Sequence, residues 1–161
     1  MKSALITGAT AGIGAEYSRF LAEKGYNLIL VARDRKRLNE TARELSKRYK
    51  VKTEVLVADL SVPSQLKKVE QRVQDAKKPI SILVNNAGFG LNRAFSQSKL
   101  SDEADLLAVL VTAPMRLTHA ALVPMTAANS GTIINISSVA SWIARSEEHT
   151  SELQSPDHLV C

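Results

Sequence analysis

A cluster of glycines near the start of the chain limits the possible folds most strongly. Gly8, Gly12 and Gly14 follow a short apolar run at 4–6 and precede apolar residues with the spacing of one helix face. A glycine-rich turn between a strand and a helix lets backbone N–H groups approach a pyrophosphate, and the helix dipole adds to the attraction. We therefore expect a nucleotide-binding turn; a tight turn without a ligand is the alternative.

Strand-like and helix-like segments alternate along the rest of the chain, as in a parallel sheet covered on both faces. We expect strands at 4–6, 27–31, 53–57, 80–84 and 132–136. The first helix should end at Gly25, a third should open at Ser61 as its N-cap, and a long one should span about 101–125. The prediction is an α/β fold, a doubly wound parallel sheet of the Rossmann type.

Composition and charge narrow the classes of partner. The chain has 161 residues, 45% of them hydrophobic and 23% charged, which is ordinary for one soluble domain. Its net charge is +5, but the basic clusters at 33–37, 67–68 and 77–78 lack interleaved aromatics, so we expect solvated helix faces and no nucleic acid. The longest apolar stretch, 106–115, is shorter than a membrane span, so we expect no membrane partner.

Cysteine usage and the first residues bear on the compartment. Cys161 is the single cysteine, which excludes a disulfide framework within the chain. Met1 and Lys2 run directly into the first strand, so no signal peptide is expected. Both observations favour the cytoplasm.

Four segments occur in the order found in one known family. They are 7–14 (TGATAGIG), 59–60 (DL), 85–88 (NNAG) and 135–138 (NISS). Together they resemble the short-chain dehydrogenase/reductase family, classical type, up to about Ala144. The resemblance implies an NAD(P)-dependent oxidoreductase that reduces a carbonyl or oxidises an alcohol, with the nicotinamide supplying or accepting the hydride.

The cofactor-binding residues that we predict fall into four groups along the chain. They are Thr7, Gly8, Thr10, Gly12, Ile13 and Gly14; Arg33; Asp59 and Leu60; and Asn86, Ala87 and Gly88. Gly8 would make the turn, Gly12 would leave room for the ligand, and Gly14 would let the helix pack against the strand. The resemblance gives Asp59 a hydrogen bond to adenine, with helix capping as the alternative. Asn85 and Asn86 could equally tie neighbouring strand ends together.

Arg33 bears on the choice between the two nicotinamide cofactors. It ends the second expected strand, where dinucleotide folds often place a carboxylate for the ribose hydroxyls. An arginine can instead pair with a ribose 2′-phosphate, so we expect NADP rather than NAD. The next residue, Asp34, could cap the following helix or contact ribose, and a plain surface arginine is the alternative for Arg33.

The resemblance makes Ser138 the catalytic candidate, a hydrogen-bond donor to the substrate carbonyl, with Ser137 as a structural neighbour and Ser141 as an alternative. The family's partners are a tyrosine and a lysine four residues apart. Here the residues four positions after Tyr17, Tyr26 and Tyr49 are Leu21, Leu30 and Thr53, so the pair is absent. The family usually also has an asparagine in the long helix, and the corresponding residue here is Leu110.

Compared with the resembled family, these departures predict that the fold is truncated after the fifth strand and that the chain is an inactive fragment of an oxidoreductase. A non-catalytic dinucleotide-binding or regulatory protein is the alternative, and a structural interaction module is a third possibility. The resemblance also implies that the parent protein forms a homo-oligomer through the helix expected at 101–125, which is apolar on more than one side.

The last segment, 145–161, differs in composition from what precedes it. It holds His149, His158 and Cys161 and continues no strand or helix pattern. Reverse translation of 145–155 gives a nucleotide sequence similar to a sequencing-library adapter. We therefore expect a dinucleotide-binding domain at 1–144 and a non-native or disordered tail at 145–161. A metal site is disfavoured because the three potential ligands have no typical spacing.

Overall fold

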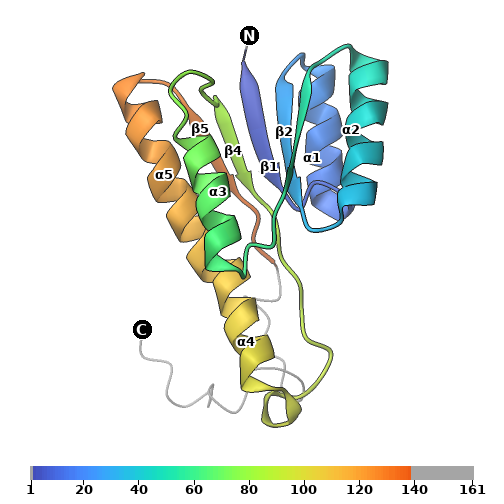
Figure 1. Ribbon diagram of the computed structural model, residues 1–161, viewed down its shortest axis with the longest axis vertical. Helices are drawn as coiled ribbons and strands as arrows, with labels where there is room; N and C mark the ends of the chain where they lie inside the picture. Colours follow the sequence, from blue (N-terminus) through green and yellow to red (C-terminus); the bar gives the residue numbers. More distant parts are fainter. Residues whose placement is uncertain (1, 139–161) are drawn as a thin grey trace.

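The computed structural model describes residues 2–138, which form a five-stranded sheet with helices on both faces (Figure 1). The strands are β1 (Ser3–Thr7), β2 (Asn27–Ala32), β3 (Thr53–Val57), β4 (Ile82–Asn85) and β5 (Thr132–Asn135). Their order is β3-β2-β1-β4-β5, and every neighbouring pair is parallel. The predicted doubly wound α/β fold is confirmed.

Two core clusters cover the two faces of the sheet. Helices α1 (Gly12–Glu23) and α2 (Arg35–Tyr49) cover one face, and α3 (Pro63–Val73) and α5 (Ala113–Ala127) cover the other (Figure 1). Successive strand residues point to opposite faces, so Ala4 and Ile6 join the α1–α2 cluster while Leu5 joins the α3–α5 cluster. Both faces are buried, which explains why the central strands are almost entirely apolar.

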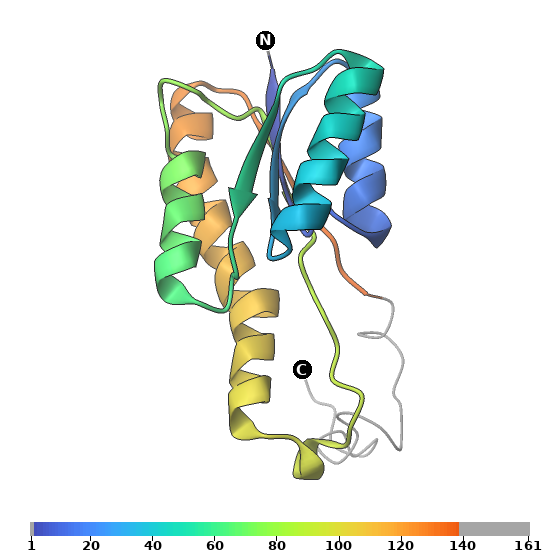
Figure 2. The same cartoon turned by 45° about the vertical axis from the view of Figure 1, so that its right-hand side comes forward.

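A long helix extends from Leu100 to Ala127, close to the predicted 101–125, and its first part, α4 (Leu100–Leu107), projects beyond the sheet (Figure 2). A short 3-10 helix, η1 (Phe95–Gln97), precedes it. A π turn, η2 (Ala108–Thr112), separates α4 from α5, and the N–H of Ala113 bonds to the carbonyl of Ala108. The ring of Pro114 supplies no N–H and clashes with the carbonyl four residues before it, which accounts for the widened turn.

By length and apolar composition alone, Leu100–Ala127 could cross a membrane; it is the one such helix among residues 2–138. Within its most apolar window, 28% is buried inside the fold. Val109, Ala113 and Leu117 belong to that buried part and pack into the α3–α5 core. The helix therefore has one apolar side that faces the sheet and another apolar side that is exposed.

Some element boundaries differ from those expected. Ser61 is not the N-cap of α3: the cap is Val62, and the N–H and hydroxyl of Ser61 both bond to Asp59 Oδ1, at 3.0 and 2.9 Å. The fourth strand begins at Ile82 rather than at residue 80. Gly25 follows the end of the first helix as expected, with a positive φ of 80°.

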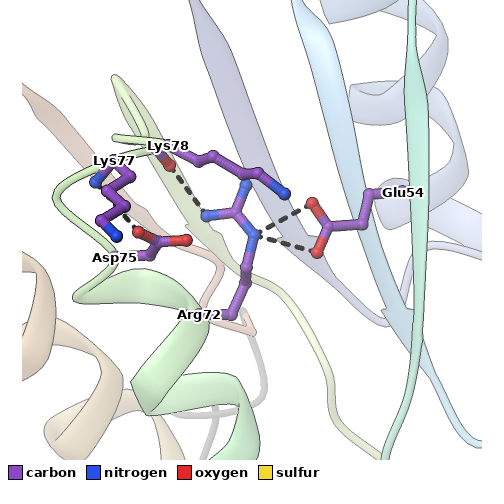
Figure 3. A network of polar contacts seen from close by, with 5 residues as sticks. All are labelled: Glu54, Arg72, Asp75, Lys77 and Lys78. Carbon is purple, nitrogen blue, oxygen red and sulfur yellow. Dashed lines mark hydrogen bonds and ion pairs between the residues drawn. The ribbon is translucent and has the colours of Figure 1, made fainter.

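A polar network fastens the edge strand β3 to α3 (Figure 3). Arg72 Nε donates to both carboxylate oxygens of Glu54, at 2.9 and 3.0 Å, and Arg72 Nη1 donates to the carbonyl of Lys78 at 2.9 Å. Asp75 accepts from the backbone N–H of Lys77 in the same turn, at 2.9 Å. One largely buried guanidinium thus joins β3, α3 and the turn that leads to β4.

Replacing Arg72 by methionine should lower the free energy of unfolding by about 1–3 kcal/mol, because the charged hydrogen bonds to Glu54 and to the carbonyl of Lys78 are lost. The Arg72 side chain is only 12% exposed. Urea denaturation followed by circular dichroism measures the change. Arg19→Met is the control, since the Arg19–Glu16 pair is solvent-exposed and should contribute little. Equal effects of the two variants would contradict the assigned role of Arg72.

Candidate functional site

The carboxyl ends of the strands meet at one edge of the sheet, and most of the predicted site residues follow them there. The glycine-rich turn follows β1, Arg33 follows β2, Asp59 lies two residues after β3, Asn86 follows β4 and Ser138 lies three residues after β5. The strand order reverses between β1 and β4, and this reversal creates the crevice in which open α/β sheets bind ligands.

The glycine-rich turn leaves backbone donors uncovered at the start of α1. Gly8 and Gly12 have positive φ values of 68° and 52°, which L side chains rarely adopt. A Cβ built at Gly12 would meet nothing within 4 Å, so open space lies next to this residue. Ala11, the N-cap, provides no side-chain cap, and the first turn contains no acidic residue. The N–H groups of this turn are therefore available to an anion.

Gly14 allows α1 to lie very close to the residues that follow β1 and β4. A Cβ at Gly14 would lie 2.3 Å from the carbonyl oxygen of Gly8 and 2.3 Å from Asn86 Nδ2. The close approach is thus between α1, its own preceding turn and a side chain from the end of β4. This close approach adds to the packing of α1 against the sheet.

Thr7 joins the end of β1 to the end of β4. Its hydroxyl donates to the carbonyl of Val84 at 3.2 Å and accepts from the N–H groups of Asn86 and Ala87, at 2.9 and 3.0 Å. Thr7 is 1% exposed, and these three bonds use the full hydrogen-bonding capacity of a hydroxyl. The Thr7 side chain therefore positions the turn after β4 and is not available to a ligand.

Asn85 and Asn86, at the end of β4, tie neighbouring elements together, which is the structural role that the sequence analysis considered for them. Asn86 Nδ2 donates to the carbonyl of Thr7 at 2.9 Å. Asn85 Nδ2 donates to Thr118 Oγ1 on α5 at 3.1 Å and to Asn135 Oδ1 on β5 at 2.8 Å. These bonds fix the end of β5, from which the chain continues to Ser138, an exposed residue.

Two arginines, one of them missed by the sequence analysis, lie at the β2 side of the crevice. Arg33 Nη1 lies 3.8 Å from Asp59 Oδ2, and its guanidinium lies 5.9 Å from the centre of the Phe89 ring. Arg37 Nη2 donates to the carbonyl of Thr10 at 3.0 Å, which brings α2 to the glycine-rich turn. The available signal was the place of Arg37 in the first turn of α2, only a few residues after the end of β2.

The carboxylates next to these arginines already have protein partners. Asp34 Oδ1 accepts from the backbone N–H of Arg37 at 3.1 Å and caps α2, one of the two roles considered for it. Asp59 accepts from Ser61 and pairs with Arg33, so it stabilises the start of the next segment without being the N-cap itself. Leu60 is 6% exposed, and its side chain belongs to the α3–α5 core.

Leu110 reaches the same edge from the π turn. A Cβ at Gly88 would lie 3.0 Å from Leu110 Cδ2, so the position that resembles the family's asparagine does adjoin the turn after β4.

The three tyrosines, Tyr17, Tyr26 and Tyr49, pack against the core on the opposite, α1–α2 face. Within residues 2–138, no group of three metal-ligating side chains comes together; the histidines and cysteine of 145–161 and Ser141 lie outside the described residues.

Comparison with known proteins agrees with the order of motifs. The family profile of the short chain dehydrogenases matches residues 2–149. A relative from Homo sapiens, inactive hydroxysteroid dehydrogenase-like protein 1, is 33% identical over 138 residues, which are 84% of this chain and 41% of that protein. The chain thus spans less than half the length of this relative.

Solved structures resemble the chain closely. The bulky-bulky ketone specific alcohol dehydrogenase from Comamonas testosteroni has a TM-score of 0.85 and 39% identity, over 88% of this chain and 57% of that one. A short-chain dehydrogenase from Sphingobium yanoikuyae in complex with NADPH has a TM-score of 0.85 and 38% identity, over 88% and 55% of the two chains. With the profile, the sheet order and the glycine-rich turn all in agreement, this chain belongs to the short-chain dehydrogenase family.

Proposed function

We propose that this chain forms the cofactor-binding part of an NADP-dependent oxidoreductase that reduces a carbonyl or oxidises an alcohol. The observation that carries the proposal is the uncapped start of α1 beside the open space at Gly12, at the point where the strand order reverses. The N–H groups of 12–14 would hold the diphosphate, and the backbone of 86–88 would adjoin the ribose. The cofactor itself, when bound, supplies the hydride chemistry.

The preference for NADP rests on the charges beside β2. Arg33 is exposed and Arg37 is held at Thr10, so two guanidinium groups adjoin the place where a ribose 2′-phosphate would lie. Asp34, the carboxylate that could repel this phosphate, is bonded to the α2 backbone. Arginine pairs with phosphate through strong charge-assisted hydrogen bonds. The Sphingobium yanoikuyae structure was solved with NADPH, which supports the same choice.

Fluorescence titration with NADPH and NADH tests this choice. We expect NADPH to bind at least about tenfold more tightly, and the preference to vanish in the double variant R33Q/R37Q, because each lost charged hydrogen bond removes about 1.5–3 kcal/mol. Arg93→Gln, a change in the exposed loop after β4, should leave both affinities unchanged. Equal binding of the two cofactors by the unaltered chain would refute the preference for NADP.

Ser138 is proposed to donate a hydrogen bond to the substrate carbonyl in the parent protein. The chain as given has no tyrosine four residues before a lysine, so we propose that it binds cofactor without turnover. The Comamonas testosteroni enzyme is named for bulky ketones, which supports a carbonyl or alcohol as the substrate class. Sustained NADPH oxidation by the purified chain with simple ketones would contradict the proposal.

A second candidate is a non-catalytic dinucleotide-binding or regulatory protein. Leu110 favours it, because a leucine beside Gly88 cannot hydrogen-bond a water where the resembled family has an asparagine. The human relative is named as inactive, which points in the same direction. Sequencing the genomic locus downstream of the codon for Ala144 separates the two candidates: a tyrosine and a lysine four residues apart there would favour the enzyme.

The exposed face of the long helix is proposed to bind a second copy of the parent chain. Leu107, Val111 and Met115 are 61%, 56% and 62% exposed and follow one another at intervals of four residues. Such a stripe on an exposed helix marks an interaction surface. Size-exclusion chromatography with light scattering should show an oligomer that dissociates in the variant Met115→Glu.

A further inference from the structure

The second helix and the residues that flank it carry a local excess of positive charge. Residues 33–52 hold nine lysines and arginines against three acidic residues, whereas the whole chain has a net charge of only +5. Among residues 2–138, no ion pair involves Arg43, Lys47, Arg48 or Lys50. This uncompensated charge produces a strong local positive potential.

Part of this charge lines a groove between α2 and the edge strand β3. The groove has a volume of about 490 Å³ and is lined by Asn39, Ala42, Arg43, Ser46, Lys47 and Thr53. Arg43 and Lys47 are exposed and lie four residues apart on one helix, so their side chains adjoin on the same face. Like charges at this spacing repel each other, and an anion between them would relieve the repulsion.

The wall of the groove is held in place by two hydroxyl bonds. Ser46 Oγ donates to the carbonyl of Val51 at 2.9 Å, and Thr53 Oγ1 donates to the carbonyl of Ala42 at 3.3 Å. These bonds join the last turns of α2 to the start of β3. The donors that remain for a ligand are the guanidinium of Arg43, the ammonium of Lys47 and the amide of Asn39, a set suited to phosphate oxygens.

We infer that the groove between α2 and β3 binds a soluble ligand with several phosphate groups, at a site separate from the dinucleotide crevice. The groove adjoins the first residue of β3, whereas Asp59 and the crevice follow the last residue of that strand. The inference therefore does not depend on the cofactor. The site is an open depression lined by two elements, α2 and β3, and we infer a small polyanion because the charged donors come from a single short stretch of α2.

Nuclear magnetic resonance of the isotope-labelled full chain, titrated with sodium tripolyphosphate at physiological ionic strength, tests the inference. We expect backbone amide shifts at Asn39, Arg43, Lys47 and Thr53, and a dissociation constant that rises about tenfold or more in R43Q/K47Q. Shifts confined to the glycine-rich turn at 8–14 would overturn the inference.

The matched control is R48Q/K68Q, which removes one arginine and one lysine from exposed helix positions that do not line the groove. It should retain tripolyphosphate binding, and both double variants should retain the affinity for NADPH. Equal loss in the two double variants would show binding to overall charge and would overturn the inference. Binding to vesicles of phosphatidylcholine and phosphatidylserine, without binding of tripolyphosphate, would overturn it as well.

Discussion

Replacing Gly14 by alanine is expected to destabilise the chain by about 3 kcal/mol or more, the upper range for overpacking, and to abolish NADPH binding. The new Cβ would lie 2.3 Å from the carbonyl oxygen of Gly8 and 2.3 Å from Asn86 Nδ2. Neither atom can withdraw easily, because one belongs to the backbone of the turn and the other bonds to the carbonyl of Thr7. Separation of α1 from the turn would also displace the donors proposed for the diphosphate.

Alanine variants of two other glycines show how much of the Gly14→Ala effect comes from the steric clash and how much from any change of glycine to alanine. A Cβ at Gly90 would meet nothing within 4 Å, so Gly90→Ala should change stability by at most about 1 kcal/mol. At Gly12 there is also space, but φ is 52°, so Gly12→Ala should lose about 1–2 kcal/mol through backbone strain. Thermal unfolding gives the stabilities and fluorescence titration gives the affinities. A Gly14→Ala variant as stable as Gly90→Ala would refute the close-packing argument.

The sheet could be predicted because its signals are local. Apolar runs such as 28–31 and 82–84 indicate the strands, and their alternation with helical stripes indicates the doubly wound order of elements. The glycine-rich turn, with its strand before and helix after, also predicts which edge of the sheet carries the site.

The partners within the site could not be predicted in this way, because they come from distant segments. Gly14 and Asn86 meet only once β1 and β4 are paired, and the reach of Arg37 to Thr10 depends on how α2 packs. Ser61 looked like an N-cap by its place before Pro63, but Asp59 takes up both its N–H and its hydroxyl. Leu60 belongs to a motif of the site, yet hydrophobic burial directs its side chain to the core.

Thr7 offers a test of how the crevice itself is built. Thr7→Val keeps the shape of the side chain but removes the hydroxyl, leaving the carbonyl of Val84 and the N–H groups of Asn86 and Ala87 without this partner. Each buried polar group left unpaired costs about 1–3 kcal/mol, so with three such groups we expect the free energy of unfolding to fall by about 3 kcal/mol or more. The affinity for NADPH should fall with it, because the turn after β4 would shift beside the crevice.

Thr7→Ser is the matched variant, because it keeps the hydroxyl and loses only a methyl group. Burial of one methyl group contributes about 1 kcal/mol, so this variant should be the more stable of the two although it is the smaller side chain. Urea denaturation of both variants measures the difference, and NADPH titration shows whether affinity follows the hydroxyl or the methyl. If serine proved as damaging as valine, packing would be what holds β1 to β4, and the hydrogen bonds of Thr7 would contribute little.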